Sequence, residues 1–192
     1  MPTLVCFGDS LTALEESKDG YERLTPRLRK QLPNWTIVNS GVSGETTRAA
    51  LARLQDDVLR HSPDLVTILF GSNDASIHRR IVLAEYERNL DIMIDRISPQ
   101  KTILLTPPPV IEKNQSKRSN NVLSTYAEAV RKISKKRECN VIDLWSYFRK
   151  NNLYENLLQQ DGLHFNKRAY LFMSELVIDK VKEIYGKTHR VH

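Results

Sequence analysis

Cysteine is scarce in this chain of 192 residues, which contains only Cys6 and Cys139. The sequence has no Cys-x-x-Cys pair and no cluster of cysteine with histidine, the patterns typical of zinc sites and redox pairs. We therefore expect no metal site and no redox centre. Cys6 lies within a short apolar run, where a free cysteine usually behaves as a small buried hydrophobic residue.

Glycine is also scarce, and the seven glycines form neither of two common nucleotide-binding signatures. The chain has no Gly-x-Gly-x-x-Gly motif, and no glycine-rich loop ends in the Gly-Lys-Ser/Thr of a P-loop. Residues 40–47, SGVSGETT, still resemble a phosphate cradle at a helix N-terminus. A flavodoxin-like nucleotide binder therefore remains an alternative from the sequence.

Long apolar runs are absent as well. None approaches the roughly 20 residues that a membrane-spanning helix needs. The N-terminal stretch MPTLVCFGDS lacks the basic region and the apolar length of a signal peptide. The sequence therefore predicts a soluble, cytoplasmic protein that does not enter a membrane.

Acidic residues are in the minority, because 29 Lys and Arg against 23 Asp and Glu give a net charge of +6. The basic residues gather in 112–120 and 131–138, without the interleaved aromatic residues or the recognised module typical of nucleic-acid binding. We expect solvated faces and no nucleic-acid partner. Lys113, Lys117 and Arg118 would suit an anionic group on a substrate, but solubility alone explains them.

What the chain does have is a regular alternation of strand and helix patterns, with no linker or repeat. This alternation predicts an α/β fold in a single domain, 1–192, with a five-stranded, mostly parallel sheet covered by helices on both faces. Strands are expected at 4–7, 35–41, 64–71, 101–109 and 140–145. Helices are expected at 23–32, 46–60, 83–97, 122–138 and 167–186.

Polar residues follow several of these strands. Gly8-Asp9-Ser10 follows the first strand, NSGVSGETT ends the second, and FGSNDAS ends the third. A fourth polar stretch, QQDGLHFN, precedes the last helix. Right-handed crossovers place the carboxyl ends of parallel strands at one edge, where ligands of such sheets bind. We therefore expect these four stretches to meet at one edge.

The side chains in these stretches match the needs of acyl transfer. Ser10 is a nucleophile only if a base removes its proton, and the imidazole of His164 is the best candidate because imidazole titrates near neutral pH. Asp161, three residues earlier, can accept the other ring N–H and hold the tautomer. The sequence therefore predicts Ser10, His164 and Asp161 as catalytic residues.

An ester also needs hydrogen-bond donors for the negative oxygen of its tetrahedral intermediate. The backbone N–H groups of Ser10 and Gly44 and the side-chain amide of Asn73 are the expected oxyanion hole. Each stretch by itself is also a common turn sequence. The Gly-x-Ser-x-Gly elbow of the α/β-hydrolases is absent, because Thr12 stands where its second glycine would be.

The four stretches FGDSLT, NSGVSGETT, FGSNDAS and DGLHFN resemble, in order, the four blocks of the SGNH hydrolases, also called the GDSL esterase/lipase family. The resemblance spans almost the whole chain. It implies a flavodoxin-like, three-layer α/β/α sandwich and the roles already given to Ser10, Gly44, Asn73, Asp161 and His164. The compact length and LLTPPP look similar to small microbial esterases and isoamyl-acetate-hydrolysing esterases.

The resemblance implies a serine esterase that forms an acyl-enzyme and needs no cofactor. We expect short-chain acyl or acetyl esters of small molecules as substrates, since no hydrophobic lid is evident. A thioesterase or lysophospholipase of the same family is the first alternative, because the fold does not choose among these substrates. A binding module that kept the fold but lost turnover is the second.

Overall fold

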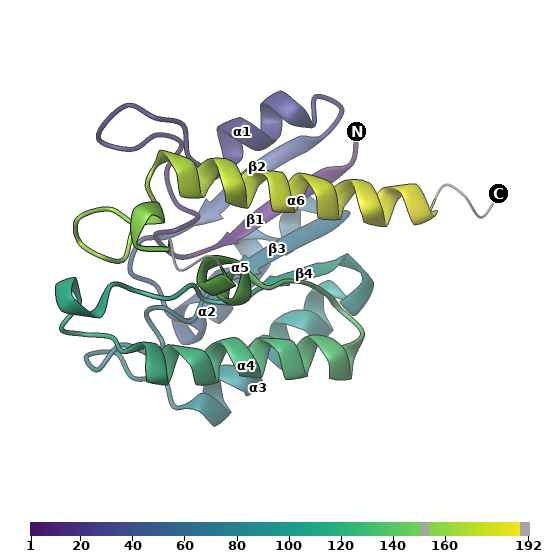
Figure 1. Cartoon of the computed structure of the whole chain (residues 1–192). Helices are drawn as coiled ribbons and strands as arrows, with labels where there is room; N and C mark the ends of the chain where they lie inside the picture. The colour runs from purple at the N-terminus through teal and green to yellow at the C-terminus, as the bar shows by residue number, and fades with distance from the viewer. Residues whose placement is uncertain (151–153, 189–192) are drawn as a thin grey trace.

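The sheet at the centre of the molecule has five strands in the order β2-β1-β3-β4-β5, and every pairing is parallel. The computed structural model in Figure 1 describes residues 1–150 and 154–188. The strand order is that of flavodoxin-like sheets. The strands are β1 Thr3–Gly8, β2 Thr36–Gly41, β3 Leu65–Leu69, β4 Thr102–Leu105 and β5 Asn140–Ile142.

Helices cover both faces of this sheet, which confirms the predicted α/β/α sandwich (Figure 1). One layer consists of α1 Leu24–Gln31, α5 Leu144–Lys150 and α6 Lys167–Thr188. The other layer consists of α2 Thr47–Asp57, α3 Leu83–Ile97 and α4 Asn120–Arg137. Short 3₁₀ helices connect these elements in the described residues: η1 Leu59–His61, η2 Pro99–Lys101, η3 Glu112–Asn114 and η4 Tyr154–Leu157.

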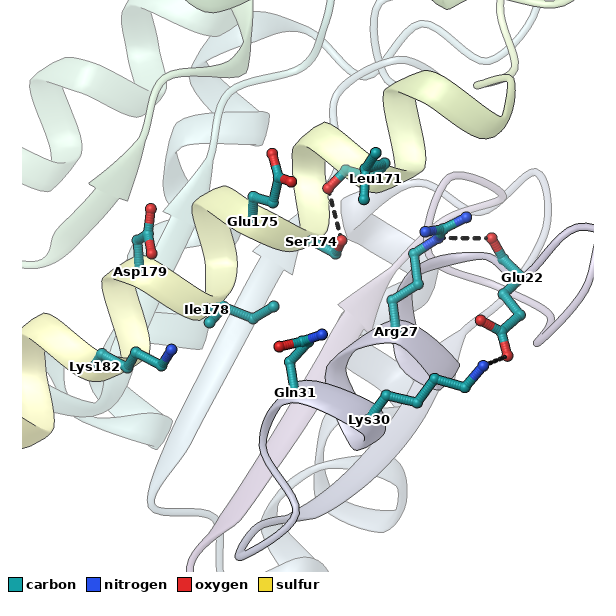
Figure 2. Close-up of a pocket in the computed structure, with 10 residues that line it drawn as sticks. All are labelled: Glu22, Arg27, Lys30, Gln31, Leu171, Ser174, Glu175, Ile178, Asp179 and Lys182. Atoms are coloured by element: carbon teal, nitrogen blue, oxygen red, sulfur yellow. Dashed lines mark hydrogen bonds and ion pairs between the residues drawn. The ribbon is translucent and has the colours of Figure 1, made fainter.

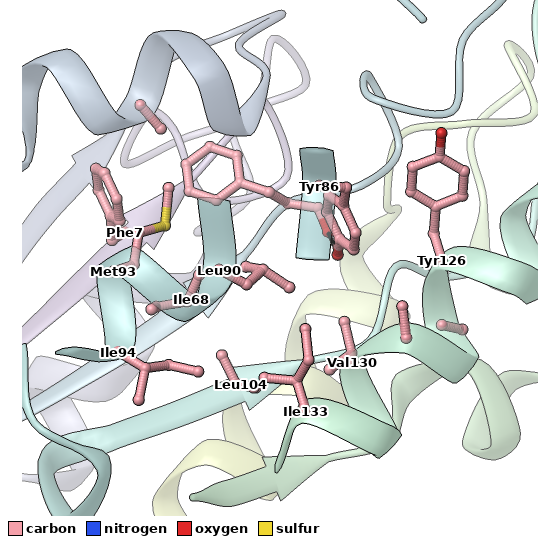
Figure 3. Close-up of a cluster of buried hydrophobic side chains, with 14 of the residues drawn as sticks. Phe7, Ile68, Tyr86, Leu90, Met93, Ile94, Leu104, Tyr126, Val130 and Ile133 are labelled. Atoms are coloured by element: carbon pink, nitrogen blue, oxygen red, sulfur yellow. Dashed lines mark hydrogen bonds between the residues drawn. The ribbon is translucent and has the colours of Figure 1, made fainter. Parts of the chain in front are cut away.

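The core forms two layers because successive side chains of a strand point to opposite faces. Leu4 and Cys6 of β1 pack toward α1 and α6, whereas Val5 and Phe7 pack toward α2 and α3. Figure 3 shows the second layer, in which strand residues meet the inward faces of α3 and α4. Cys6 is fully buried, as predicted for a small hydrophobic residue.

The fifth strand is shorter than the sequence predicts. The expected strand 140–145 ends at Ile142, and α5 begins two residues later at Leu144. Asp143 explains the change, because its carboxylate accepts a hydrogen bond from the backbone N–H of Ser146, at 3.1 Å, in the first turn of α5. A side-chain acceptor of this kind satisfies an N–H that has no partner within the helix.

The start of α2 is not capped by a side chain of its own N-cap residue. Thr46 is the N-cap residue, but its side chain makes no capping hydrogen bond. The carboxylate of Asp74, which follows β3, instead accepts from the backbone N–H of Thr47 at 3.0 Å and from its hydroxyl at 2.5 Å. The loop after β3 is therefore attached to the N-terminus of α2.

Candidate active site

The register of the sheet brings three of the predicted stretches to one edge. Gly8 at the end of β1 pairs with Gly41 of β2 on one side and with Leu69 of β3 on the other. The loops that begin at Asp9, Val42 and Phe70 therefore leave the sheet at the same level, as predicted.

Ser10 lies in a tight turn directly after β1. The backbone carbonyl of Asp9 accepts from the N–H of Thr12 at 3.0 Å, and its side-chain Oδ1 accepts from the N–H of Leu11 at 2.9 Å. Gly8 permits this turn because a Cβ there would lie 2.8 Å from the carbonyl oxygen of Leu69. The glycine before Asp-Ser is thus required for the chain to turn so closely against β3.

Ser10, His164 and Asp161 form a continuous chain of hydrogen bonds, although 154 residues separate the serine from the histidine. Ser10 Oγ lies 3.0 Å from Nε2 of His164, and Nδ1 of the same ring lies 2.5 Å from Oδ2 of Asp161. A carboxylate beside Nδ1 favours the tautomer with a proton on that atom, which leaves Nε2 free to accept the Ser10 proton. The structure therefore brings these three predicted residues together.

Asp161 is oriented by its own loop. Its Oδ1 accepts from the backbone N–H groups of Leu163, at 2.9 Å, and His164, at 3.0 Å, while Oδ2 faces the imidazole. Partial burial acts to raise the pKa of Asp161, but these hydrogen bonds outweigh it and hold the pKa below its usual value. A carboxylate that stays ionised is what a partner of the imidazole needs.

Asn73 is buried in the loop after β3, and it contacts the chain neighbours of both Ser10 and Gly44. Its Nδ2 lies 3.1 Å from Oδ2 of Asp9 and 3.0 Å from the backbone carbonyl of Glu45. Gly44 has a φ of +75°, a conformation that favours glycine, and its carbonyl accepts a hydrogen bond from Arg79. Both hydrogens of the Asn73 amide thus have acceptors within the protein.

The carboxyl group next to Ser10 has an unusual pKa. Burial raises the pKa of Asp9 to about 7, and the charges of Asp74 and Glu45 act in the same direction. The hydrogen bond from Leu11 and the positive charge of Arg118 oppose this rise without cancelling it. Asp9 therefore titrates near neutral pH while it is hydrogen-bonded to Asn73.

Two arginines contact site residues in ways the sequence does not predict: the sequence gives Arg23 no role, and it suggests for Arg118 only contact with an anionic group on a substrate. Arg23 is buried, donates to the backbone carbonyl of Ser10, and lies with its guanidinium 4.9 Å from the ring centre of Tyr170. Arg118 donates to Oδ1 of Asn73 at 2.9 Å. No spacing or motif in the sequence distinguishes either arginine from those on the surface.

An open cleft of about 440 Å³ reaches Ser10, and most of the residues that line it are polar or charged. It is lined by Ser10, Leu14, Ser17, Lys18, Asp19, Arg23, Ser43, Gln159, Asp161 and His164. Gly44 and Asn73 are not among these lining residues. The cleft therefore exposes the nucleophile and the base, and of the three predicted oxyanion donors only the N–H of Ser10 belongs to a residue that lines it.

Figure 2 shows a second cleft, of about 410 Å³, between α1 and α6. Lys30 pairs there with the carboxylate of Glu22 at 2.6 Å, and Arg27 donates to the Glu22 carbonyl at 2.9 Å. The hydroxyl of Ser174 donates to the carbonyl of Leu171, one turn earlier in α6. This second cleft offers no activated nucleophile, so the cleft at Ser10 is the candidate active site.

Neither a metal cluster nor a membrane span occurs in the described part of the chain. Within residues 1–150 and 154–188, no group of three or more His, Cys, Asp or Glu side chains is arranged to hold a metal ion. No helix in the same residues is both long enough and apolar enough to cross a membrane.

Comparison with known proteins establishes the family. Residues 6–171 match the GDSL-like lipase/acylhydrolase family, and the chain therefore belongs to it. A crystal structure of a lipase/acylhydrolase from Enterococcus faecalis is 31% identical and superposes with a TM-score of 0.90, covering 95% of this chain and 96% of that one. The protein is an esterase or acylhydrolase of the GDSL type.

Two curated relatives have names that include a substrate. An isoamyl acetate-hydrolyzing esterase 1 homolog from Mus musculus is 29% identical over 95% of this chain and 84% of its own length. An acetylxylan esterase from Geobacillus stearothermophilus is 26% identical over 76% of this chain and 71% of its own length. The predicted likeness to isoamyl-acetate-hydrolysing esterases is thus confirmed.

Proposed function

We propose that this protein is a serine esterase that hydrolyses short-chain acyl esters, acetyl esters in particular, through an acyl-enzyme. The observation that carries the proposal is the chain of hydrogen bonds from Ser10 Oγ to His164 and on to Asp161, at 3.0 and 2.5 Å. A serine that is within reach of a base, itself oriented by a carboxylate, is the arrangement that activates a hydroxyl for nucleophilic attack.

The reaction begins when Ser10 Oγ attacks the ester carbonyl carbon and its proton passes to Nε2 of His164. The carbonyl oxygen becomes negative, and the N–H groups of Ser10 and Gly44 with the amide of Asn73 are its proposed donors. The C–O bond to the alcohol then breaks as His164 returns the proton to the leaving oxygen. Water repeats the two steps to release the acid and restore Ser10.

The proposed role of Asn73 requires a rearrangement of its hydrogen bonds. Both Nδ2 hydrogens have acceptors, Asp9 Oδ2 and the Glu45 carbonyl. An oxyanion would therefore have to share one hydrogen with one of these two acceptors, or take it from that acceptor. Hydrogen bonds of catalytic groups commonly realign in this way when substrate binds.

The walls of the cleft support a small acyl group. Leu14 is the one apolar side chain among the residues that line the cleft in the described part of the chain. A long acyl chain would meet only this one apolar side chain there, whereas it gains about 25 cal/mol for each Å² of apolar surface that it buries. The relatives named for isoamyl acetate and acetylxylan both act, by those names, on acetate esters.

The proposal is tested with p-nitrophenyl acetate, butyrate and octanoate, together with an acyl-CoA thioester. We expect kcat/KM to fall as the acyl chain lengthens, and Ser10→Ala to remove hydrolysis of every substrate. Faster hydrolysis of octanoate or of the thioester would refute the substrate class while leaving the serine mechanism intact. Failure of a fluorophosphonate probe to label Ser10 in the wild type would instead favour a binding module without turnover.

A further inference from the structure

Residues 110–118, which follow β4, are attached to the loop that carries Asp161 and His164. The N–H of Ile111 donates to the carbonyl of Gly162 at 2.9 Å, and the side chain of Gln115 donates to the carbonyl of Asp161 at 2.7 Å. The contact is close, because a Cβ on Gly162 would lie 2.8 Å from the carbonyl oxygen of Ile111. Segment 110–118 is therefore part of the wall behind the acid–base residues, although the sequence suggests a solvated run.

The same segment reaches the opposite side of the site through Arg118. The guanidinium donates from Nε to the carbonyl of Ser72 at 2.5 Å and from Nη2 to Oδ1 of Asn73 at 2.9 Å. Its third nitrogen, Nη1, donates to the side-chain oxygen of Gln115 at 3.0 Å. Arg118 and Gln115 thus connect the Asn73 loop to the Asp161 loop by a continuous path of hydrogen bonds.

Arg118 differs from the other basic residues of this segment. Lys113 is exposed and pairs with Glu155 at 3.2 Å, and the side chain of Lys117 is also exposed. Arg118 is half-buried, and each of its three guanidinium nitrogens has an acceptor. A planar guanidinium provides this fixed fork of donors, which the single ammonium of a lysine cannot reproduce.

The contact with Arg118 determines which end of the Asn73 amide faces Asp9. Because Oδ1 is bound by a cation, Nδ2 points toward the carboxylate of Asp9 and the carbonyl of Glu45. The reversed amide would place its NH₂ against the guanidinium and its oxygen against the carboxylate. A positive charge at Oδ1 also polarises the amide, which strengthens the Nδ2 hydrogens as donors.

We propose that Arg118 is a positioning residue for the esterase reaction, which orients and polarises the Asn73 amide toward the oxyanion of the substrate. The inference rests on the proposed function, because it requires Asn73 to act as an oxyanion donor. Gln115 supports Arg118 in this role, because it accepts a hydrogen bond from the guanidinium and donates one to the carbonyl of Asp161.

The test is a double-mutant cycle of Arg118→Met with Asn73→Ala, measured on p-nitrophenyl acetate. Removal of one oxyanion donor costs roughly 10²- to 10³-fold in kcat, so a misdirected donor should cost roughly 10- to 100-fold, with KM changed little. In the Asn73→Ala background we expect Arg118→Met to cause no further loss. Lys117→Met, which removes an exposed charge from the same segment, is the matched control and should leave kcat unchanged.

Each outcome separates the inference from the proposed function. If Asn73→Ala retains the wild-type kcat, the oxyanion assignment itself fails. If Asn73→Ala loses turnover but Arg118→Met does not, only the inference fails. Equal losses from Arg118→Met in both backgrounds would show that Arg118 acts through the fold and would also overturn it. Should Arg118→Met not fold, the same cycle is run with Arg118→Lys, for which we expect a smaller but still non-additive loss.

An independent readout comes from Asp9, because the charge of Arg118 acts to lower its pKa. NMR titration of the Asp9 carboxyl carbon should show a higher pKa in Arg118→Met than in the wild type. The Lys117→Met control should leave that pKa unchanged. An unchanged Asp9 pKa in folded Arg118→Met would show that the guanidinium does not act on the Asn73–Asp9 pair, and would overturn the inference.

Discussion

The two sides of the candidate site are built in opposite ways. On the acid–base side, Asp161 and His164 come from one short loop, and their side chains are 44% and 34% exposed. On the oxyanion side, Asn73 is only 6% exposed and is bound to Asp9, Glu45 and Arg118, which lie 64, 28 and 45 residues away in the sequence. The side chains of Asp161 and His164 are oriented by hydrogen bonds within their own loop, whereas the side chain of Asn73 is held by contacts with distant segments.

The carboxyl groups of the two sides reflect this difference. Asp161 accepts two backbone N–H groups and faces an imidazole, so its pKa lies below the usual value despite partial burial. At Asp9, burial outweighs the hydrogen bond from the backbone N–H of Leu11 and raises the pKa of this carboxyl to about 7. The two carboxyl groups therefore differ in charge near neutral pH. The base His164 is next to an ionised Asp161, whereas the buried donor Asn73 is next to Asp9, which can be neutral.

The largest expected effect comes from removal of the acid–base side. His164→Ala takes away the base that accepts the Ser10 proton, and we expect kcat to fall on the order of 10⁴-fold or more, as for other triads. Ser10→Ala should give a loss of similar size, because nucleophile and base act as a unit. Hydrolysis of p-nitrophenyl acetate measures both, and His78→Ala, an exposed histidine, is the control. Near wild-type turnover in His164→Ala would refute the proposed mechanism.

Removal of the oxyanion donor should have a smaller effect. Asn73→Ala leaves the chain from Ser10 to His164 and Asp161 intact, so turnover should continue at a rate lower by roughly 10²- to 10³-fold. We expect the loss in kcat rather than in KM, since the donor acts on charge that develops in the transition state. Fluorophosphonate labelling of Ser10 should persist in this variant. A loss as large as that of His164→Ala would contradict the separation of the two sides.

The same contrast explains what could be predicted from the sequence. Asp161 and His164 lie three residues apart, so a short loop can present both, and parallel strands place Ser10 at the same edge. The alternation of strands and helices likewise predicted five strands and two helical layers. These features depend on local spacing and on the general rules of parallel sheets.

What the sequence could not reveal depends on contacts between distant segments. Arg118 and Lys117 are adjacent basic residues in one polar run, yet only Arg118 turns inward to Asn73. Asp74 follows Asn73 directly, but it binds the start of α2 instead of facing the cleft. Asp143 ends β5 and starts α5 with a hydrogen bond of its side chain. The residue types alone do not predict which of these side chains contacts a distant segment and which faces solvent.

The raised pKa of Asp9 predicts a pH dependence of stability. An aspartate is ionised in the unfolded chain above about pH 4, whereas in the folded protein Asp9 keeps its proton up to about pH 7. The folded state therefore binds more protons between these values, and the free energy of unfolding should fall as the pH rises from 4 to 7. The charges of Asp74, Glu45 and Arg118 face this carboxyl and contribute to its pKa.

Urea unfolding at several pH values checks this prediction. We expect Asp9→Asn to remove the part of the pH slope that comes from this carboxyl, a difference on the order of a few kcal/mol between pH 4 and pH 8. The slope is compared, rather than the absolute stability, because the new amide also alters the contact with Asn73. Asp161 works in the opposite sense: its lowered pKa stabilises the fold above about pH 4, and that contribution is lost as the pH falls further. If the free energy of unfolding changes with pH equally in the wild type and in Asp9→Asn, the raised pKa of Asp9 is refuted.

The smallest effect concerns the contact between the Asp161 loop and segment 110–118. Gly162 has a φ of +70°, and a Cβ there would lie 2.8 Å from the carbonyl oxygen of Ile111. Gly20 has a similar φ of +75°, but a Cβ there would meet nothing within 4 Å. Both substitutions to alanine strain the backbone by roughly 1 kcal/mol, and only Gly162→Ala also pushes two segments apart.

Thermal or urea unfolding should therefore show a larger loss of stability for Gly162→Ala than for Gly20→Ala. We expect about 1–3 kcal/mol of additional destabilisation, because backbone at 2.8 Å cannot yield as a flexible side chain can. Equal losses would mean that the two loops separate at little cost, so that segment 110–118 does not hold the acid–base side. A larger loss in Gly162→Ala would show that even the more local side of the site depends, at one glycine, on a distant part of the chain.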